Sequence, residues 1–148
     1  MSAPMRRNAD AIAVGLAKTL ELRVDTQLTV PALAAAFGGF RDMPPVFATA
    51  FMIAFIEWAC IEALADHLAT DQRTVGIHVD VSHVAATPVG MAVKAEVALV
   101  AVKGRRLRFK VRCTDAAGLI GEGVHERAII DQAAFMGRLA AKADSVLV

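Results

Sequence analysis

The sequence predicts an α+β fold, in which one long helix is wrapped by a curved antiparallel sheet of about five strands. Two observations carry this prediction. Residues 46–68 contain no Gly or Pro and are apolar around nearly the whole circumference of a helix, so this helix needs cover on all sides. Strand-like runs joined by short connections follow it, and short connections make successive strands antiparallel neighbours.

The first part of the chain supplies one strand and a loop. Residues 1–10 are polar and predict a loose lead, whereas residues 18–30 alternate well enough to form a first strand. Residues 31–45 combine glycines and prolines with the apolar side chains of Phe37 and Phe40, which is typical of a lid over a pocket. An ordinary connector packed on the core has the same composition, so both interpretations stay open.

The part after the long helix supplies the rest of the sheet. The strand-like runs cover residues 74–84, 91–103, 105–114 and 119–130. Turn residues separate these runs, and residues 132–142 predict a short terminal helix. A curved sheet around the helix, with a second copy of the chain completing the enclosure, is the hotdog architecture.

Composition indicates one domain that forms an oligomer. A chain of 148 residues is long enough for a single domain over residues 1–148 with its own core. Hydrophobic residues make up 56% of it, a high share for a monomer. The longest uncharged apolar stretch, residues 44–56, is well short of the roughly 20 residues of a membrane-spanning helix. We therefore expect a cytoplasmic homodimer, with further pairing of dimers left open, and no contact with a membrane.

Charge and cysteine content exclude several other classes. The net charge of +1 gives no bulk attraction to nucleic acid, so nucleic acid is not expected as a partner. Cys60 and Cys113 lie in apolar surroundings without metal or redox spacing, and we expect both to be reduced core residues. The histidines form no metal-binding pattern, and a glycine-rich loop for a nucleotide is lacking. We expect no metal and no cofactor.

Three residues together could perform acyl chemistry. Thr49 lies near the start of the long helix, Glu57 lies two turns further along it, and His83 ends a later strand-like run. An alcohol, a carboxylate and an imidazole are the groups that activate a hydroxyl or a water for attack on an acyl carbonyl. A carboxylate inside an apolar run is costly unless it is paired, which favours a functional or paired Glu57. Each residue alone has an alternative interpretation. Thr49 could be an ordinary helix-start residue, and His83 could be a structural histidine on a strand.

Four stretches of the chain resemble the fluoroacetyl-CoA thioesterase family of hotdog enzymes. They are PPVFATAFMIAFIEWAC, SHVAATPVG, VKGRRLRF and GEGVHERAIID, and together they extend over residues 44–131. The resemblance implies a thioester hydrolase in which a Thr, a Glu and a His cooperate at the thioester carbonyl. These residues are Thr49, Glu57 and His83 in this chain.

The same resemblance implies residues that shape the acyl pocket. They are Gly76, on the strand after the helix, and Arg127 of the His-Glu-Arg segment. The aromatic gate of the family aligns poorly with residues 31–43, where Phe37 and Phe40 take its place. Thioester hydrolysis is therefore implied, whereas selectivity for a fluorinated acyl group is not.

Helix geometry limits how the three groups can meet. Eight residues of helix separate Thr49 from Glu57 by about 12 Å along the axis, so their side chains do not touch directly. The imidazole of His83 could bridge that gap with one nitrogen toward each partner. His83 would be the general base for Thr49 or for a water, and Glu57 would orient the imidazole. Opposite subunits of a dimer could make the same contacts, and Thr49 could be the nucleophile or position the water.

Two basic segments supply further candidates. Arg105 and Arg106 mark a hairpin tip and could bind the phosphates of coenzyme A, although a solvated turn is as compatible with them. On the late strand, alternation places His125 and Arg127 on one face and Glu126 on the other. Arg127 could therefore hold the acyl carbonyl, or it could form an ordinary cross-strand ion pair.

Three functions are compatible with this pattern. The predicted one is an acyl-CoA thioesterase for a small acyl group, in which coenzyme A is part of the substrate. A non-catalytic protein that binds an acyl-CoA or another small ligand would keep the same cavity. A hotdog dehydratase or hydratase would use a paired Asp and His, and the spacing of Thr49 and Glu57 argues against it.

Overall fold

The computed structural model describes residues 12–147 of the chain, and the predicted lead at residues 1–10 lies outside the described residues. The strands are β1 (Ala17–Arg23), β2 (Gln72–Val81), β3 (Ala92–Lys103), β4 (Arg106–Asp115) and β5 (Gly118–Asp131). The helices are α1 (Thr49–Leu64) and α2 (Gln132–Val146). Short 3-10 helices form η2 (Thr26–Leu28), η3 (Val30–Leu33), η4 (Gly38–Phe40) and η5 (Ala65–His67).

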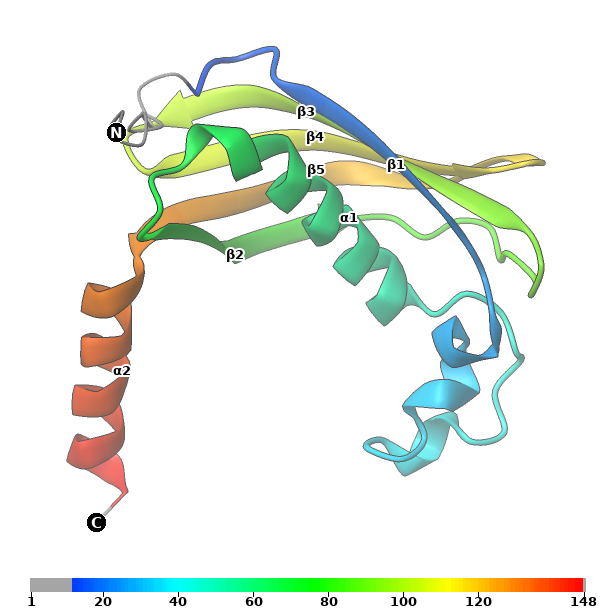
Figure 1. The fold of residues 1–148 in the computed structure, drawn as a ribbon. Helices are drawn as coiled ribbons and strands as arrows, with labels where there is room; N and C mark the ends of the chain where they lie inside the picture. The colour runs from blue at the N-terminus through cyan, green and yellow to red at the C-terminus, as the bar shows by residue number, and fades with distance from the viewer. Residues whose placement is uncertain (1–11, 148) are drawn as a thin grey trace, which may run out of the picture.

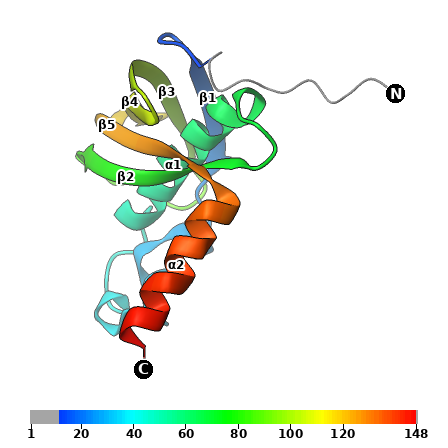
Figure 2. The ribbon, with the colours of Figure 1, turned by 90° about the vertical axis from the view of Figure 1, so that its left-hand side faces the viewer.

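The strands form one antiparallel sheet in the order β1-β3-β4-β5-β2. The sheet curls around α1, which crosses its concave side (Figures 1 and 2). On β4, Leu107, Phe109 and Val111 are buried, whereas the basic residues between them are exposed. This alternation directs one face of the sheet to the helix. The predicted α+β hotdog architecture is confirmed.

The core lies between α1 and the sheet. The buried residues of the helix are Met52, Phe55, Ile56, Ala59, Cys60, Ala63 and Leu64. Burial of each large apolar side chain contributes about 1.5–3 kcal/mol, so this interface is the main source of stability. Cys60 and Cys113 are both buried and free, and burial raises the pKa of each thiol to about 12, as befits unreactive core residues.

Strand β2 occupies a different place from the predicted one. We expected it to neighbour β3, but it pairs with β5 at the edge of the sheet, while β3 pairs with β1. The connection over residues 82–91 is not a tight hairpin. It is anchored at the end of β4, where the hydroxyl of Thr87 donates to Oδ2 of Asp115 at 2.7 Å. The antiparallel meander therefore comprises only β3, β4 and β5.

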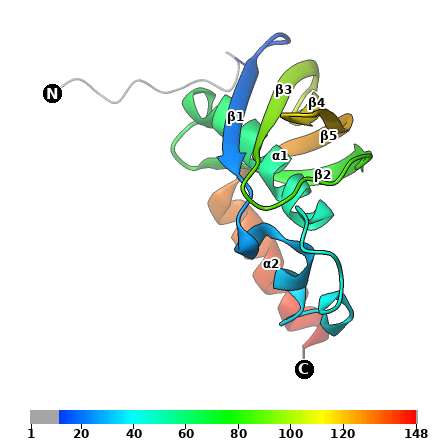
Figure 3. The ribbon, with the colours of Figure 1, turned by 90° about the vertical axis from the view of Figure 1, so that its right-hand side faces the viewer.

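The segment between β1 and α1 also departs from the expected boundaries. β1 ends at Arg23, because the side chain of Asp25 accepts a hydrogen bond from the N–H of Gln27 and starts a 3-10 helix. The predicted loop at residues 31–45 contains most of η3 and all of η4, and it has no strand. This segment and α2 extend beyond the sheet on the side where α1 lies (Figures 1 and 3).

One face of α1 remains open. Trp58 is 46% and Ile61 is 42% exposed on the helix, although the apolar sequence predicts cover on all sides. On the edge strand β2, Ile77 and Val79 are exposed as well. The sheet thus covers only part of the apolar helix. Within residues 12–147, no helix combines the length and the hydropathy needed to cross a bilayer.

Candidate active site

Thr49 and His83 form a hydrogen-bonded pair. Oγ1 of Thr49, the first residue of α1, lies 2.7 Å from Nδ1 of His83. This is a short distance for a hydrogen bond between a hydroxyl and a ring nitrogen. If Nδ1 carries no proton, it accepts the hydroxyl proton of Thr49, which is the arrangement that general-base activation of an alcohol requires.

His83 reaches Thr49 because the chain stays extended beyond the end of β2. The N–H of Ser82 donates to the carbonyl of Glu122 at 2.9 Å, and the N–H of Val84 donates to the carbonyl of Ile120 at 2.7 Å. A Cβ at Gly121 would lie 2.2 Å from the carbonyl oxygen of Ser82. Glycine therefore permits the close approach of backbones that places His83.

The surroundings of His83 favour its neutral form. Burial lowers the pKa of this imidazole below its usual value of 6.5, and the backbone of Ala85 acts in the opposite direction. A neutral imidazole can accept a proton at neutral pH. Its Nε2 is buried and has no hydrogen-bond partner among residues 12–147. A substrate, a water or a second subunit could supply that partner.

The start of α1 presents hydrogen-bond donors beside Thr49. The preceding residue, Ala48, makes no side-chain cap, and its carbonyl accepts from the N–H of Met52 at 2.9 Å. The N–H groups of residues 49–51 therefore have no partner within the helix. Such groups can stabilise the negative charge that develops on an attacked carbonyl oxygen. The Thr49 hydroxyl contacts His83 rather than capping the helix.

Glu57 does not complete the predicted relay within one chain. Its Oε2 instead accepts from Nη1 of Arg127 at 2.8 Å, in an ion pair whose side chains are 38% and 3% exposed, respectively. The imidazole of His83 lies beside the first turn of α1, two turns away from Glu57. Among residues 12–147, His83 therefore contacts Thr49 but not Glu57, and the relay through one imidazole stays a prediction. A site shared between subunits remains compatible with the geometry.

Arg127 is held on several sides by its own chain. Its Nε donates to Oγ1 of Thr74 at 2.9 Å, and its Nη2 donates to the carbonyl of Thr74 at 2.8 Å. Its Nη1 donates to Glu57 and lies 3.2 Å from Nε2 of His125. These contacts use four of the five N–H groups of the guanidinium. The carboxylate partner is on α1, so the alternative of a cross-strand ion pair is wrong.

Gly76 makes room for this group of side chains. A Cβ at position 76 would lie 3.1 Å from Oε2 of Glu57 and 3.2 Å from Cε1 of His125. Gly76 also pairs directly with Arg127 across β2 and β5. We call Glu57, Thr74, Gly76, His125 and Arg127 the Arg127 cluster. The role of Gly76 and Arg127 in an acyl pocket stays a prediction.

The sequence interpretation missed two members of this cluster. His125 is 1% exposed and contacts Arg127, and Thr74 binds the same guanidinium twice. Alternation along the late strand had placed His125 on the face of Arg127, which was the available signal. No comparable signal pointed to Thr74, because only the pairing of β2 with β5 brings it to Arg127.

The remaining candidates lie apart from Thr49 and His83. Arg105 forms an exposed ion pair with Asp131 at 3.1 Å. The register pairs Arg106 with Ala128, several residues along β5 from the carbonyl groups that anchor the segment around His83. The binding of CoA phosphates by Arg105 and Arg106 stays a prediction.

Phe37 and Phe40 are in contact with each other on the segment outside the sheet. Their rings meet edge to face with centroids 6.1 Å apart, and Phe37 is 60% exposed. Phe40 is half-buried, and an aromatic pair with one exposed ring on a segment without strands agrees with the composition of a lid. Its action on a substrate stays a prediction.

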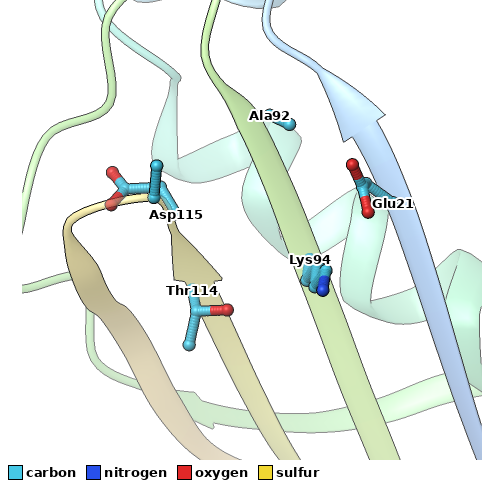
Figure 4. Close-up of a pocket in the computed structure, with 6 residues that line it drawn as sticks. Glu21, Ala92, Lys94, Thr114 and Asp115 are labelled. Carbon is cyan, nitrogen blue, oxygen red and sulfur yellow. The ribbon is translucent and has the colours of Figure 1, made fainter.

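A pocket of about 280 Å³ lies on the face of the sheet turned away from α1 (Figure 4). Its lining residues are Glu21, Ala92, Lys94, Thr114, Asp115 and Ala116. The Asp115 carboxylate there is already bonded to the hydroxyl of Thr87 and the N–H of Ala117. The lining includes none of the predicted site residues, so the Thr49–His83 pair remains the candidate active site.

Known proteins share both the sequence and the fold of this chain. A family model described as fluoroacetyl-CoA-specific thioesterase matches residues 29–133. The fluoroacetyl-CoA thioesterase of Streptantibioticus cattleyicolor is 38% identical over 133 residues, which cover 90% of this chain and 96% of that protein. A solved structure of a fluoroacetyl-CoA thioesterase, also 38% identical, gives a TM-score of 0.86 over 90% of this chain and 98% of that one. A thioesterase superfamily member from Thermus thermophilus is 26% identical, with a TM-score of 0.79 over 90% and 97% of the two chains.

Proposed function

Because the chain belongs to the fluoroacetyl-CoA-specific thioesterase family, we propose that it hydrolyses the thioester of a small acyl-CoA with Thr49, His83 and Glu57. Family membership confirms the predicted resemblance and the predicted enzyme class, a thioester hydrolase. The observation that supports the assignment of residues is the 2.7 Å contact between Oγ1 of Thr49 and Nδ1 of His83. This contact supports the assignment because a hydroxyl and an imidazole meet beside the N–H groups that start α1.

The first proposed step is attack on the thioester carbonyl. Neutral His83 accepts the hydroxyl proton of Thr49 at Nδ1, and the Thr49 oxygen bonds to the carbonyl carbon. The carbonyl oxygen becomes negative beside the N–H groups that start α1. When the carbonyl reforms, the carbon–sulfur bond breaks and coenzyme A leaves as a thiol with the proton from His83.

The second step hydrolyses the acyl ester on Thr49. A water gives one proton to His83 and bonds to the ester carbon, after which the carboxylic acid leaves and Thr49 regains its proton. A water positioned by Thr49 would form the same products without an acyl-enzyme. Mass spectrometry of the intact protein after rapid quenching distinguishes the routes, because only the covalent route adds the mass of the acyl group at Thr49.

In this proposal, Glu57 acts at a site formed with the second subunit of a homodimer. Two observations support it. Nε2 of His83 is buried without a partner among the described residues, and the open face of α1 exposes Trp58 and Ile61. A second copy over this face would remove apolar surface from water and bring its Glu57 to the Thr49–His83 pair.

Mixing two inactive variants tests the shared site. Thr49→Ala and Glu57→Gln homodimers are unfolded, mixed in equal amounts and refolded. If Thr49 and Glu57 of opposite subunits form each site, half of the dimers are mixed and carry one intact site, so about a quarter of wild-type activity returns. No recovery, with dimers present by light scattering, means that the residues act within one subunit.

The proposed substrate carries a small acyl group, with coenzyme A as part of the substrate and no further cofactor. Solved structures of the related fluoroacetyl-CoA thioesterase contain fluoroacetate with CoA, or acetyl-CoA. We extend small-acyl hydrolysis to this chain from its 38% identity to that protein. The segment with Phe37 and Phe40 is the region where selectivity among acyl groups would differ.

Thiol release from a panel of short, branched, aromatic and fluorinated acyl-CoA esters tests the function. The wild type should release thiol, and His83→Ala should be slower by at least about a hundredfold, as expected for the loss of a positioned base. The ester with the highest kcat/KM then defines the acyl group. Saturable acyl-CoA binding without release would instead identify a non-catalytic binding protein.

A further inference from the structure

We infer that His125 is a positioning residue: as a neutral imidazole it fixes the guanidinium of Arg127, which in turn fixes the carboxylate of Glu57. The inference rests on the proposed function, because it concerns the orientation of a proposed catalytic carboxylate. It adds a residue that lies outside the Thr49, His83 and Glu57 constellation.

The contacts of His125 determine where its proton lies. Its Nδ1 is 2.7 Å from the carbonyl oxygen of His78, which can only accept, so Nδ1 carries a proton and donates. Its Nε2 is 3.2 Å from Nη1 of Arg127, which can only donate, so Nε2 carries a lone pair and accepts. Both neighbours therefore require the same neutral tautomer.

The surroundings of His125 keep it neutral. Burial lowers the pKa of this imidazole below 6.5, the carbonyl of His78 raises it, and the charge of Arg127 lowers it again. Glu57 on α1 opposes the effect of Arg127, and the side chain of His78 on β2 adds to it. The residue opposite on β4 is the apolar Phe109. A second proton, at Nε2, would face the N–H of Arg127 at 3.2 Å.

The link from His125 to Glu57 passes through one nitrogen. Nη1 of Arg127 donates to Oε2 of Glu57 at 2.8 Å and also meets Nε2 of His125. Thr74 holds the other end of the guanidinium through its hydroxyl and its carbonyl. The direction of Nη1, and with it the place of the Glu57 carboxylate, therefore depends on an acceptor at Nε2 of His125.

Close packing makes this link stiff. Any Cβ at position 76 would already crowd both Glu57 and His125, so the cluster has little space in which to rearrange. Within residues 12–147, the hydrogen bond of Glu57 uses Oε2. Its Oε1 is the oxygen available to an acyl site, and the link through Arg127 sets where that oxygen points.

Two substitutions at His125 test the inference, because they replace different halves of the imidazole. His125→Gln can keep an acceptor near Nε2, whereas His125→Asn can keep only a donor near Nδ1. We expect kcat for thiol release to fall by about ten- to a hundredfold in His125→Asn, with KM little changed, and to recover most of this loss in His125→Gln. His78→Gln is the matched control, because the hydrogen bond from His78 to His125 uses the backbone carbonyl, which this substitution keeps. Equal kcat in all four proteins would overturn the inference.

Nitrogen-15 NMR of the imidazole rings provides a readout that needs no activity. The chain has four histidines, so the His125 signals are those that persist in each of His67→Gln, His78→Gln and His83→Ala. We expect a protonated Nδ1 and an unprotonated Nε2 at pH 7. A protonated Nε2 would overturn the inference even if both variants failed to fold. A wild type that shows the expected tautomer but releases no thiol would refute the proposed function and leave this hydrogen-bond assignment in place.

Discussion

The Thr49–His83 pair and the Arg127 cluster are both polar groups next to α1, but they differ in how far their hydrogen bonds are satisfied. Thr49 and His83 share one contact, and Nε2 of His83 is buried without a partner among the described residues. Arg127 makes four contacts and is 3% exposed. The first group can accept a substrate or a partner, whereas the guanidinium of the second finds its partners within one chain.

This difference indicates separate contributions to activity and stability. Loss of a sparsely bonded pair leaves little unsatisfied in the folded chain, so it should affect catalysis alone. Loss of one member of the Arg127 cluster leaves buried polar groups without their hydrogen-bond partner. Because water does not replace that partner, the loss lowers the stability of the fold. Glu57 belongs to the cluster and to the proposed catalytic set, so its substitution should affect both properties.

The largest expected effect is on catalysis at His83. His83→Ala should lower kcat/KM for thiol release by at least about a hundredfold, because the base that faces the Thr49 hydroxyl is lost. Its thermal midpoint should stay close to that of the wild type. Calorimetry beside the thiol assay checks both, and a large drop in the midpoint would contradict the view of a loosely bonded pair.

The next effect should appear in stability at Glu57. Glu57→Ala removes the charged acceptor of a nearly buried guanidinium and should lower the free energy of unfolding by about 1–3 kcal/mol. Urea unfolding measures this loss. Glu57→Gln keeps an acceptor for Arg127, so it should recover part of the stability while remaining catalytically impaired. Equal stability of Glu57→Ala and the wild type would mean that the ion pair contributes nothing.

A smaller effect is expected from filling the space at Gly76. Gly76→Ala would place a methyl group 3.1 Å from Oε2 of Glu57, and we expect a loss of about 1–3 kcal/mol together with a lower kcat. Gly137→Ala on α2 is the matched control, because no atom lies within 4 Å of the added carbon. That change should stabilise the protein by about 0.5–1 kcal/mol. Similar urea curves for both variants would show that the cluster tolerates the methyl group.

The smallest effect should be the pH dependence of stability. The pKa values of His83 and His125 are both lowered in the folded chain. Below pH 6.5 the unfolded chain therefore binds protons that the folded chain does not, so stability decreases as the pH falls. In His125→Gln, the thermal midpoint should change less between pH 8 and pH 5 than it does in the wild type. The decrease in kcat/KM at low pH, which we expect from protonation of His83, should remain in His125→Gln below pH 6.5.

Sequence periodicity predicted the elements well, but it predicted their neighbours less well. The apolar run around Met52 and Phe55 specified α1, and alternation specified the inward residues of β4. The place of β2 beside β5 was not predicted, because a connection such as residues 82–91 can lead to more than one neighbour. Hydrogen bonds across the sheet, which periodicity does not contain, decide that choice.

The contacts of the candidate site were likewise predicted only in part. The motif around Thr49 and the one around His83 suggested a contact between them, and the structure contains it. The ion pair between Glu57 and Arg127 within one chain was not predicted. Arg127 lies on β5, and only the tertiary structure brings its guanidinium to the Glu57 carboxylate on α1.

By itself, the sequence determined the α+β class, the thioesterase family and the chemical types available at the site. These depend on hydrophobic period and on local motifs, which a linear chain displays directly. Only the tertiary structure decided which carboxylate meets which cation, which tautomer His125 adopts and which face of α1 stays open. Those outcomes depend on distances of a few ångströms between residues far apart in the chain, and strand register and helix docking set such distances.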